Sequence, residues 1–224
     1  MKEITEAVNV YSSKYLNVQN DWYSWREINE SKLPAGINLP KGNQYLKNLV
    51  LKEELHKKWK TSSTIEEKHE LIKYYISTWG GIHTNSAESM HLYTTLSAEE
   101  LIGNGKKGIA SWSKAIVIHD PEKYAIYDAR VAISLNCIQE QFNVGSKILF
   151  PVLSSRNKVV AKGNSLIKNL AKRDRWNKAE EGVFYNQYLT LLADVSENHE
   201  TNISTIEMLL FAKAEELVEQ SLFS

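Results

Sequence analysis

The sequence is poor in the residues and patterns that define several protein classes. Its 224 residues include one cysteine, Cys137, and four prolines. A single thiol excludes an internal disulfide framework, and it excludes a zinc or iron–sulfur site built only from cysteines. No apolar run approaches the roughly 20 residues that a membrane-spanning helix needs, and residues 1–16 lack the basic and apolar regions of a secretory signal. We therefore expect a cytoplasmic protein that does not enter a membrane.

Net charge is also absent, but the charges are unevenly distributed. The 27 basic and 27 acidic side chains cancel over the whole chain. Residues 106–178 hold 14 basic and 5 acidic residues, a net of +9, whereas residues 179–224 hold 1 and 9, a net of −8. This polarity predicts one basic face on a neutral protein, which suits a polyanion. The alternative is a surface charge pattern that has no partner.

Alternating strand patterns are nearly absent, and helical spacing of apolar residues dominates. The pattern KAIVIH at 114–119 is the one exception, and we interpret it as the end of a buried helix. Helices are predicted over residues 43–60, 64–78, 128–142, 164–171, 183–193 and 203–219. The sequence thus predicts an all-α fold, a single compact helical domain over residues 1–224. Within it we expect an N-terminal region and loop at 1–42, a hairpin and basic core at 43–178, and closing helices at 179–224.

The most informative segment is residues 96–131, which read LSAEELIGNGKKGIASWSKAIVIHDPEKYAIYDARV. Ser97 and Glu100 have the spacing of a capping box, which starts a short helix. We expect that helix to end at Gly103 and a second helix to begin near Lys106. Glycines can adopt left-handed backbone angles, so a tight turn is predicted between the two helices; it comprises Gly103, Asn104 and Gly105.

The start of the second helix is expected to favour an anion. Unpaired amides at a helix N-terminus point outward and bind phosphate groups. Lys106 and Lys107 would add positive charge at the same place. After this helix comes an extended link containing Pro121, and then Asp128 at the start of the next helix.

The order of turn, lysine, apolar helix, extended link, aspartate and helix resembles the helix–hairpin–helix DNA glycosylases of the superfamily with a Gly/Pro-rich loop and a catalytic Asp. The chain is closer to the variants without an iron–sulfur cluster, such as the 8-oxoguanine glycosylases, because it has a single cysteine. Asn104 departs from the family, which carries a hydrophobic residue between the two glycines. The matching residues are Leu101, Gly103, Gly105, Lys107, Asp128, Arg130 and Val131.

The resemblance implies an enzyme that flips a damaged or modified base out of DNA and cleaves its N-glycosidic bond. The base could belong to modified foreign DNA, such as that of a phage. Asp128 is the expected catalytic carboxylate, which stabilises positive charge on the sugar or activates the attacking group; the alternative is that it only caps a helix. Lys107 or Lys114 could attack the sugar and add strand cleavage, and the alternative for both is phosphate contact or solvation.

Further residues are expected to bind DNA or the flipped base. Backbone contacts are predicted at the turn and along the basic segment: Gly103, Asn104, Gly105, Lys106, Arg130, Lys158, Lys162, Lys172 and Arg173. Residues 162–165 are interpreted as the start of a helix that faces a phosphate. The base pocket is expected to include Tyr127, Trp112 and Trp79, although core packing is the alternative for each ring.

The expected partner is double-stranded DNA, bound by a monomer. No metal or redox cofactor is expected, and the resemblance allows at most a monovalent cation at the hairpin carbonyls. Two alternatives remain open. One is a non-catalytic DNA-binding module with the same fold, and the other is a scaffold whose acidic C-terminal segment binds a basic protein.

Overall fold

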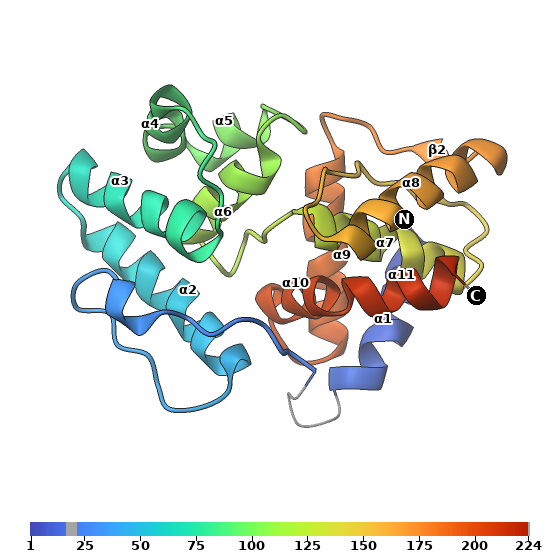
Figure 1. Ribbon diagram of the computed structural model, residues 1–224, viewed down its shortest axis with the longest axis horizontal. Helices are drawn as coiled ribbons and strands as arrows, with labels where there is room; N and C mark the ends of the chain where they lie inside the picture. The colour runs from blue at the N-terminus through green and yellow to red at the C-terminus, as the bar shows by residue number, and fades with distance from the viewer. Residues whose placement is uncertain (17–21, 224) are drawn as a thin grey trace. The chain divides into compact units, whose positions relative to one another are not determined.

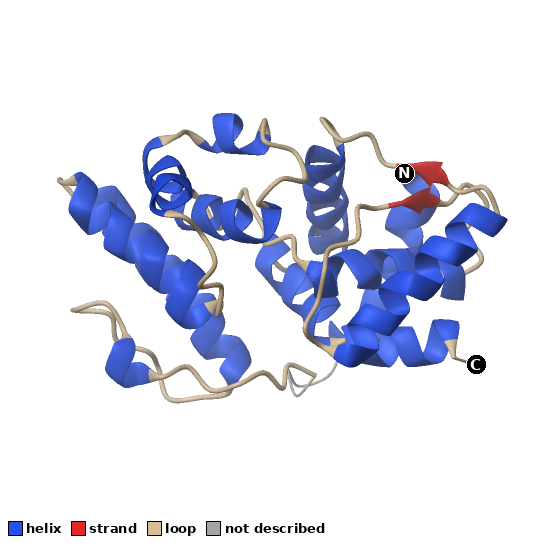
Figure 2. Cartoon of the chain, turned by 45° about the horizontal axis from the view of Figure 1, so that its top comes forward, coloured by secondary structure: helices blue, strands red, loops and turns tan. Residues whose placement is uncertain are grey.

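The computed structural model describes residues 1–16 and 22–223, and it confirms the all-α fold class (Figure 1). Its α-helices are α1 Lys2–Leu16, α2 Gln44–Thr61, α3 Ile65–Lys73, α4 Ala87–Thr95, α5 Ala98–Ile102, α6 Ile109–His119, α7 Ala129–Gln141, α8 Lys158–Arg173, α9 Phe184–Asn198, α10 Ile203–Ala212 and α11 Ala214–Leu222. Two shorter helical segments are the 3₁₀-helix Glu30–Lys32 and the π-helix Tyr74–Trp79. The strands β1 Ile148–Leu149 and β2 Asn177–Lys178 form one parallel pair (Figure 2).

The chain divides into two compact units. We call Ser24–Ile126 the central unit, and Met1–Tyr23 together with Tyr127–Ser224 the discontinuous unit. These boundaries differ from those expected at 42/43 and 178/179. The expected hairpin and basic core is split, since its glycine-rich turn lies in the central unit and its basic helix α8 lies in the discontinuous unit.

In the discontinuous unit, α7 is packed against α1, α8, α10 and α11. The Ser134 hydroxyl on α7 donates to the Leu210 carbonyl of α10 at 2.6 Å. The buried amide of Asn136 donates to the carbonyl of Phe150 at 3.1 Å and accepts from its N–H at 2.9 Å. These bonds satisfy backbone groups that the helical core would otherwise leave unpaired.

The interpretation of residues 162–165 as a helix start is wrong. Helix α8 begins at Lys158, and Asn157 caps it by accepting from the Val160 N–H at 3.0 Å. Gly163 lies inside the helix, where an added Cβ would stand 2.7 Å from Cγ2 of Val218 on α11. The glycine that suggested a break instead allows two helices to pack closely.

In the central unit, α6 is packed against α2, α3, α4, α5 and the π-helix. The apolar run at 114–119 lies in α6, which confirms the helical interpretation of that segment. The segment predicted as one helix over 64–78 contains two types of helix: α3 ends at Lys73, and the next six residues are a π-helix. The Gly80 N–H accordingly donates to the Tyr75 carbonyl, five residues back, at 3.0 Å.

Other differences from the prediction are local. The helix predicted over 203–219 is broken at Lys213, where the backbone turns between α10 and α11. Helix α4 has no counterpart in the prediction. Among the described residues, no helix is both long and apolar enough to cross a membrane.

Candidate functional site

The start of α5 matches the predicted capping box. The Ser97 hydroxyl accepts from the Glu100 N–H at 3.2 Å, and the Glu100 carboxylate accepts from the Ser97 N–H at 2.8 Å. The helix ends at Ile102, with Gly103 as its C-cap. This first half of the motif is therefore as the sequence indicated.

The turn after α5 is longer than predicted. Gly105 and Gly108 have left-handed φ values of 56° and 70°, whereas Gly103 has an ordinary helical φ of −58°. Gly108 is the N-cap, so α6 begins at Ile109 and not near Lys106. An added Cβ at Gly108 would stand 2.6 Å from the Tyr93 hydroxyl. The position therefore needs glycine for two reasons, its backbone angle and its close neighbour.

Several backbone amides that were expected to face a phosphate form hydrogen bonds within the turn instead. The N–H groups of Asn104, Gly105, Lys107 and Ile109 all donate to carbonyls between residues 101 and 106. The exposed side chains of Lys106 and Lys107 remain as the cationic groups of the turn. Attraction for a phosphate here would therefore come from side chains more than from a helix N-terminus.

Asp128 is the N-cap of α7, at the predicted helix start. Its Oδ1 accepts from the N–H groups of Arg130 at 2.9 Å and Val131 at 3.1 Å. These two bonds fix the carboxylate at the positive end of the helix and leave Oδ2 outside the cap. Asp128 as a residue is half-buried, and both of the cap bonds are made by Oδ1.

A second carboxylate belongs to the same neighbourhood. Glu207 on α10 is 3% exposed, and Tyr188 on α9 is fully buried. Burial raises the pKa of the Tyr188 phenol well above its usual value, and the negative charges of Glu207 and Asp128 contribute to the same shift. Both carboxylates therefore lie within electrostatic range of one phenol. The sequence analysis missed Glu207 and Tyr188, because each lies at an apolar position of a helix and belongs to no motif.

Arg130 was expected to bind DNA. In the structure its guanidinium pairs with the Glu215 carboxylate of α11 and lies 5.2 Å from the centre of the Phe211 ring. The pKa of the Glu215 carboxyl is lowered, most strongly by its hydrogen bond with Asn157 and next by its pairing with Arg130. These contacts direct Arg130 towards neighbouring helices of its own unit.

The two candidate lysines have opposite surroundings. Lys107 is exposed in the turn, whereas Lys114 is 4% exposed and its Nζ donates to the Ala110 carbonyl at 2.8 Å. The Lys114 Cε atom also stands 2.9 Å from the position of a Cβ added at Gly80. The exposed Lys107 can reach a phosphate, whereas the Lys114 amine is held inside its own unit by the Ala110 carbonyl.

The three predicted pocket rings differ in their accessibility. Trp112 is fully buried, and its indole N–H donates to the Lys107 carbonyl at 3.1 Å. Tyr127 is also fully buried; its hydroxyl donates to the Pro151 carbonyl at 2.9 Å, and its ring has edge contacts with Phe184 and Tyr188. These two rings are part of the packed core, which was the alternative for each. Trp79 is the partly exposed ring of the three.

The predicted basic residues lie on one side of α8. Lys158, Lys162, Lys172 and Arg173 are all exposed. At about 3.6 residues per turn, they fall within an arc of roughly 100°. The buried face of the helix, centred near Ile167, lies opposite. Arg173 is paired with Asp174 at 2.7 Å, which lowers the net charge at that end.

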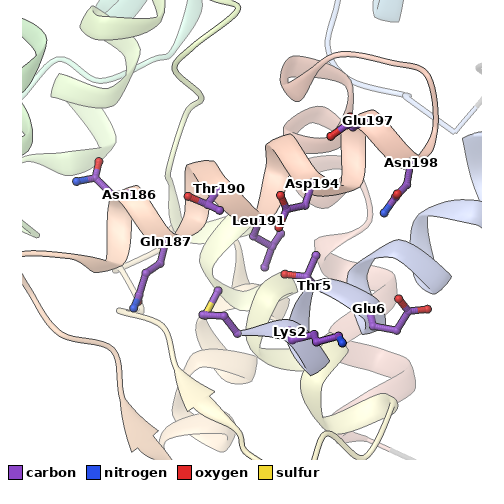
Figure 3. Close-up of a pocket in the computed structure, with 11 residues that line it drawn as sticks. Lys2, Thr5, Glu6, Asn186, Gln187, Thr190, Leu191, Asp194, Glu197 and Asn198 are labelled. Atoms are coloured by element: carbon purple, nitrogen blue, oxygen red, sulfur yellow. The ribbon is translucent and has the colours of Figure 1, made fainter.

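The groove between α1 and α9 has a volume of about 630 Å³ (Figure 3). Its charged lining is mainly acidic, since Glu6, Asp194 and Glu197 face solvent beside Lys2. Within the described part of the chain, no aromatic side chain lines it. Three carboxylates repel phosphate and the lining offers no ring for a base to stack on, so we do not assign this groove to DNA.

The described part of the chain contains no cluster of metal ligands. No group of three or more His, Cys, Asp or Glu side chains there could hold a metal ion. No protein-family model, curated protein or solved structure matches the chain.

Proposed function

We infer that this protein is a DNA N-glycosylase in which Asp128 is the catalytic carboxylate. The observation that carries the proposal is the way in which α7 begins. Oδ1 of Asp128 is fixed by two backbone N–H groups, and the residue stands at the expected place after the turn, the buried helix α6 and the extended link. The resemblance to helix–hairpin–helix glycosylases is based on this same order.

The chemistry suits a carboxylate held in this way. When the N-glycosidic bond breaks, its electron pair leaves with the base, and positive charge develops on the sugar. An ionised Asp128 stabilises that charge or takes a proton from the attacking water, whose oxygen forms the new bond to the sugar. The departing base gains a proton, and the products are the free base and an abasic site.

DNA binding is the second part of the proposal. The exposed lysines of the turn and the exposed basic side of α8 supply cations for the phosphate backbone. Strand cleavage would need a lysine nucleophile, for which Lys107 and Lys114 are the two candidates.

A non-catalytic DNA-binding module is the second candidate. The burial of Trp112 and Tyr127 favours it, because buried rings are not available to hold a flipped base. Such a module would keep the salt-sensitive binding and form no abasic sites.

The test uses labelled duplexes that carry a panel of damaged and modified bases, including bulky phage-type cytosines. Abasic sites are counted with and without alkali for the wild type, Asp128→Asn and Asp120→Asn. Asp120 is the matched control, since its carboxylate also caps backbone N–H groups, those of Glu122 and Lys123, in the same link.

We expect Asp128→Asn to lower abasic-site formation at least 100-fold and Asp120→Asn to leave it unchanged. Equal activity in both variants would remove Asp128 from the mechanism. Salt-dependent binding without product on any duplex would favour the binding module, and absence of binding would favour the protein scaffold. Strand cuts without alkali would assign lyase activity, and Lys107→Ala and Lys114→Ala would then identify the nucleophile.

A further inference from the structure

The central unit contains a small pocket that neither Asp128 nor the glycine-rich turn enters. It lies between the segment 25–29 and the π-helix, and its volume is about 160 Å³. A cavity of about 150 Å³ is large enough for one benzene-sized ring. The pocket is therefore the size of a single six-membered ring. Its lining residues are Trp25, Arg26, Glu27, Ile28, Asn29, Tyr74, Thr78 and Trp79.

The Trp79 wall of this pocket is held in place. The Trp79 ring stacks on Tyr75 with 4.4 Å between ring centres, and its indole N–H donates to the Asn48 side chain at 2.9 Å. The Arg26 guanidinium donates to the Trp79 carbonyl and lies 5.8 Å from the centre of the Trp25 ring. Rings that are fixed before binding lose little freedom when a ligand stacks on them.

The π-helix explains why Trp79 lies at this pocket. Its wider turn moves the chain out of α-helical register, and single π-helical turns are frequent at functional sites. A Cβ at Gly80 would stand 2.6 Å from the Ile76 carbonyl, so the chain needs glycine directly after the π-helix. The backbone of this wall is therefore closely packed.

The polar groups of the lining select for a ring that carries hydrogen-bond acceptors. Asn29 already uses its side-chain oxygen, which accepts from the N–H and the hydroxyl of Ser31 at 3.2 Å and 2.7 Å, so it offers its amide N–H groups. Burial raises the pKa of Tyr74 to about 12, and its phenol, like any tyrosine at neutral pH, is protonated and can donate. Arg26 and Thr78 are further donors, and Glu27 offers an acceptor.

We propose that this pocket binds an unpaired pyrimidine base of a nucleic acid, stacked against Trp25 and Trp79 and hydrogen-bonded by Arg26 and Asn29. A pyrimidine has one ring, carbonyl oxygens for the donors and, in cytosine, an amino group for Glu27. A phenylalanine or tyrosine side chain would fill the same volume and leave most of these donors unpaired. Stacking on aromatic side chains is the usual way in which proteins hold unpaired bases. The proposal does not depend on base excision by Asp128.

The test follows the indole N–H signals of the six tryptophans by NMR while nucleosides are added to the full chain. The probes are cytidine, thymidine, adenosine, ribose and N-acetyltyrosinamide. We expect the pyrimidine nucleosides to shift the Trp25 and Trp79 signals with millimolar affinity and to leave Trp112 and Trp176 unchanged. Adenosine should bind at least threefold more weakly, because its double ring exceeds the pocket.

Two variants and one control sharpen this test. Trp25→Ala and Arg26→Met should each weaken cytidine binding at least fivefold, and circular dichroism checks that each variant folds. Trp176→Phe, in the discontinuous unit, should leave the affinity unchanged. The proposal is overturned if cytidine binds no better than ribose, if N-acetyltyrosinamide binds more tightly, or if both variants keep the wild-type affinity. Abasic-site formation by the wild type is a separate measurement, so this failure and that of the glycosylase proposal are distinguishable.

Discussion

Helices α6 and α7 are consecutive in the chain, but they begin in contrasting ways. Helix α6 begins after Gly108, which offers no side chain to the helix, and the turn before it uses several of its own amides. Helix α7 begins after its N-cap Asp128, whose carboxylate accepts from two amides. The first start is fixed by backbone shape and the second by charge. A charged start can take part in chemistry, whereas a start fixed by shape serves mainly to set the position of its own helix.

Among the substitutions that test this difference between the two helix starts, Gly108→Ala should have the largest effect on stability. The left-handed backbone angle and the contact with the Tyr93 hydroxyl together should lower the free energy of unfolding by about 2–4 kcal/mol. Urea denaturation measures the loss. Adding Tyr93→Phe removes the hydroxyl and should restore part of the loss, while the cost of the backbone angle remains. A single variant as stable as the wild type would show that the turn is not fixed by shape.

The next largest effect on stability should come from the C-terminal end of α6, where protonation of His119 makes stability depend on pH. Burial lowers the pKa of His119 to about 4, and the nearby charges of Lys68 and His56 contribute. Because the folded state binds the proton more weakly than the unfolded state, stability should be full above pH 6.5. It should fall as the pH drops from 6.5 to 4, by about 1–3 kcal/mol.

His119→Phe should remove most of this pH dependence. The new ring can keep the stacking on Trp59, whose ring centre lies 4.4 Å from that of His119. Thermal unfolding at pH 7 and pH 4.5 makes the comparison. An equal loss of stability in the variant and the wild type would place the acid sensitivity elsewhere in the chain.

Two substitutions of Asp128 should separate the cap from the catalyst. Asp128→Ala should lower the free energy of unfolding by about 1 kcal/mol, whereas Asp128→Asn should be close to neutral, because asparagine is an equally good N-cap. Both should lose the proposed glycosylase activity. Denaturation and abasic-site assays on the same preparations test this. Activity retained in the asparagine variant would show that Asp128 caps the helix and has no catalytic role.

The smallest effects should come from the lysines of the turn. Lys106→Ala and Lys107→Ala should each reduce the slope of log affinity against log salt by about 0.9, one phosphate contact each. Fluorescence anisotropy with a labelled duplex at several salt concentrations measures the slope, with exposed Lys73 as the control site. Unchanged slopes in both variants would remove the turn from the proposed DNA-binding surface.

Local chemistry in the sequence was enough to predict much of the fold. The capping residues Ser97 and Asp128 marked helix starts correctly, and the apolar run at 114–119 was correctly assigned to a helix. Glycine was the less reliable guide. Gly163 suggested a helix start but lies where two helices touch, and Gly108 was overlooked although it ends the turn. Both roles depend on a neighbour distant in the sequence, Val218 for one and Tyr93 for the other.

The candidate site was harder to predict, for the same reason. Spacing along the chain identified Asp128, but burial decides what the nearby side chains can do. Trp112 and Lys114 are two residues apart on α6 and carry no local sign that both are buried. Glu207 is 79 residues beyond Asp128, and only the packing of α7, α9 and α10 brings both carboxylates near Tyr188.

The discontinuity of one unit has a consequence for synthesis on the ribosome. Helix α1 packs against α7 and α9, and its Glu3 accepts from the N–H groups of Gly145 and Ser146 at 2.9 Å and 3.2 Å. At about 5–20 residues per second, roughly 100 intervening residues delay these partners by on the order of 5–20 s. The central unit is contiguous and can be complete by then. During that interval the apolar side of α1 is without the partners that it has in the folded unit.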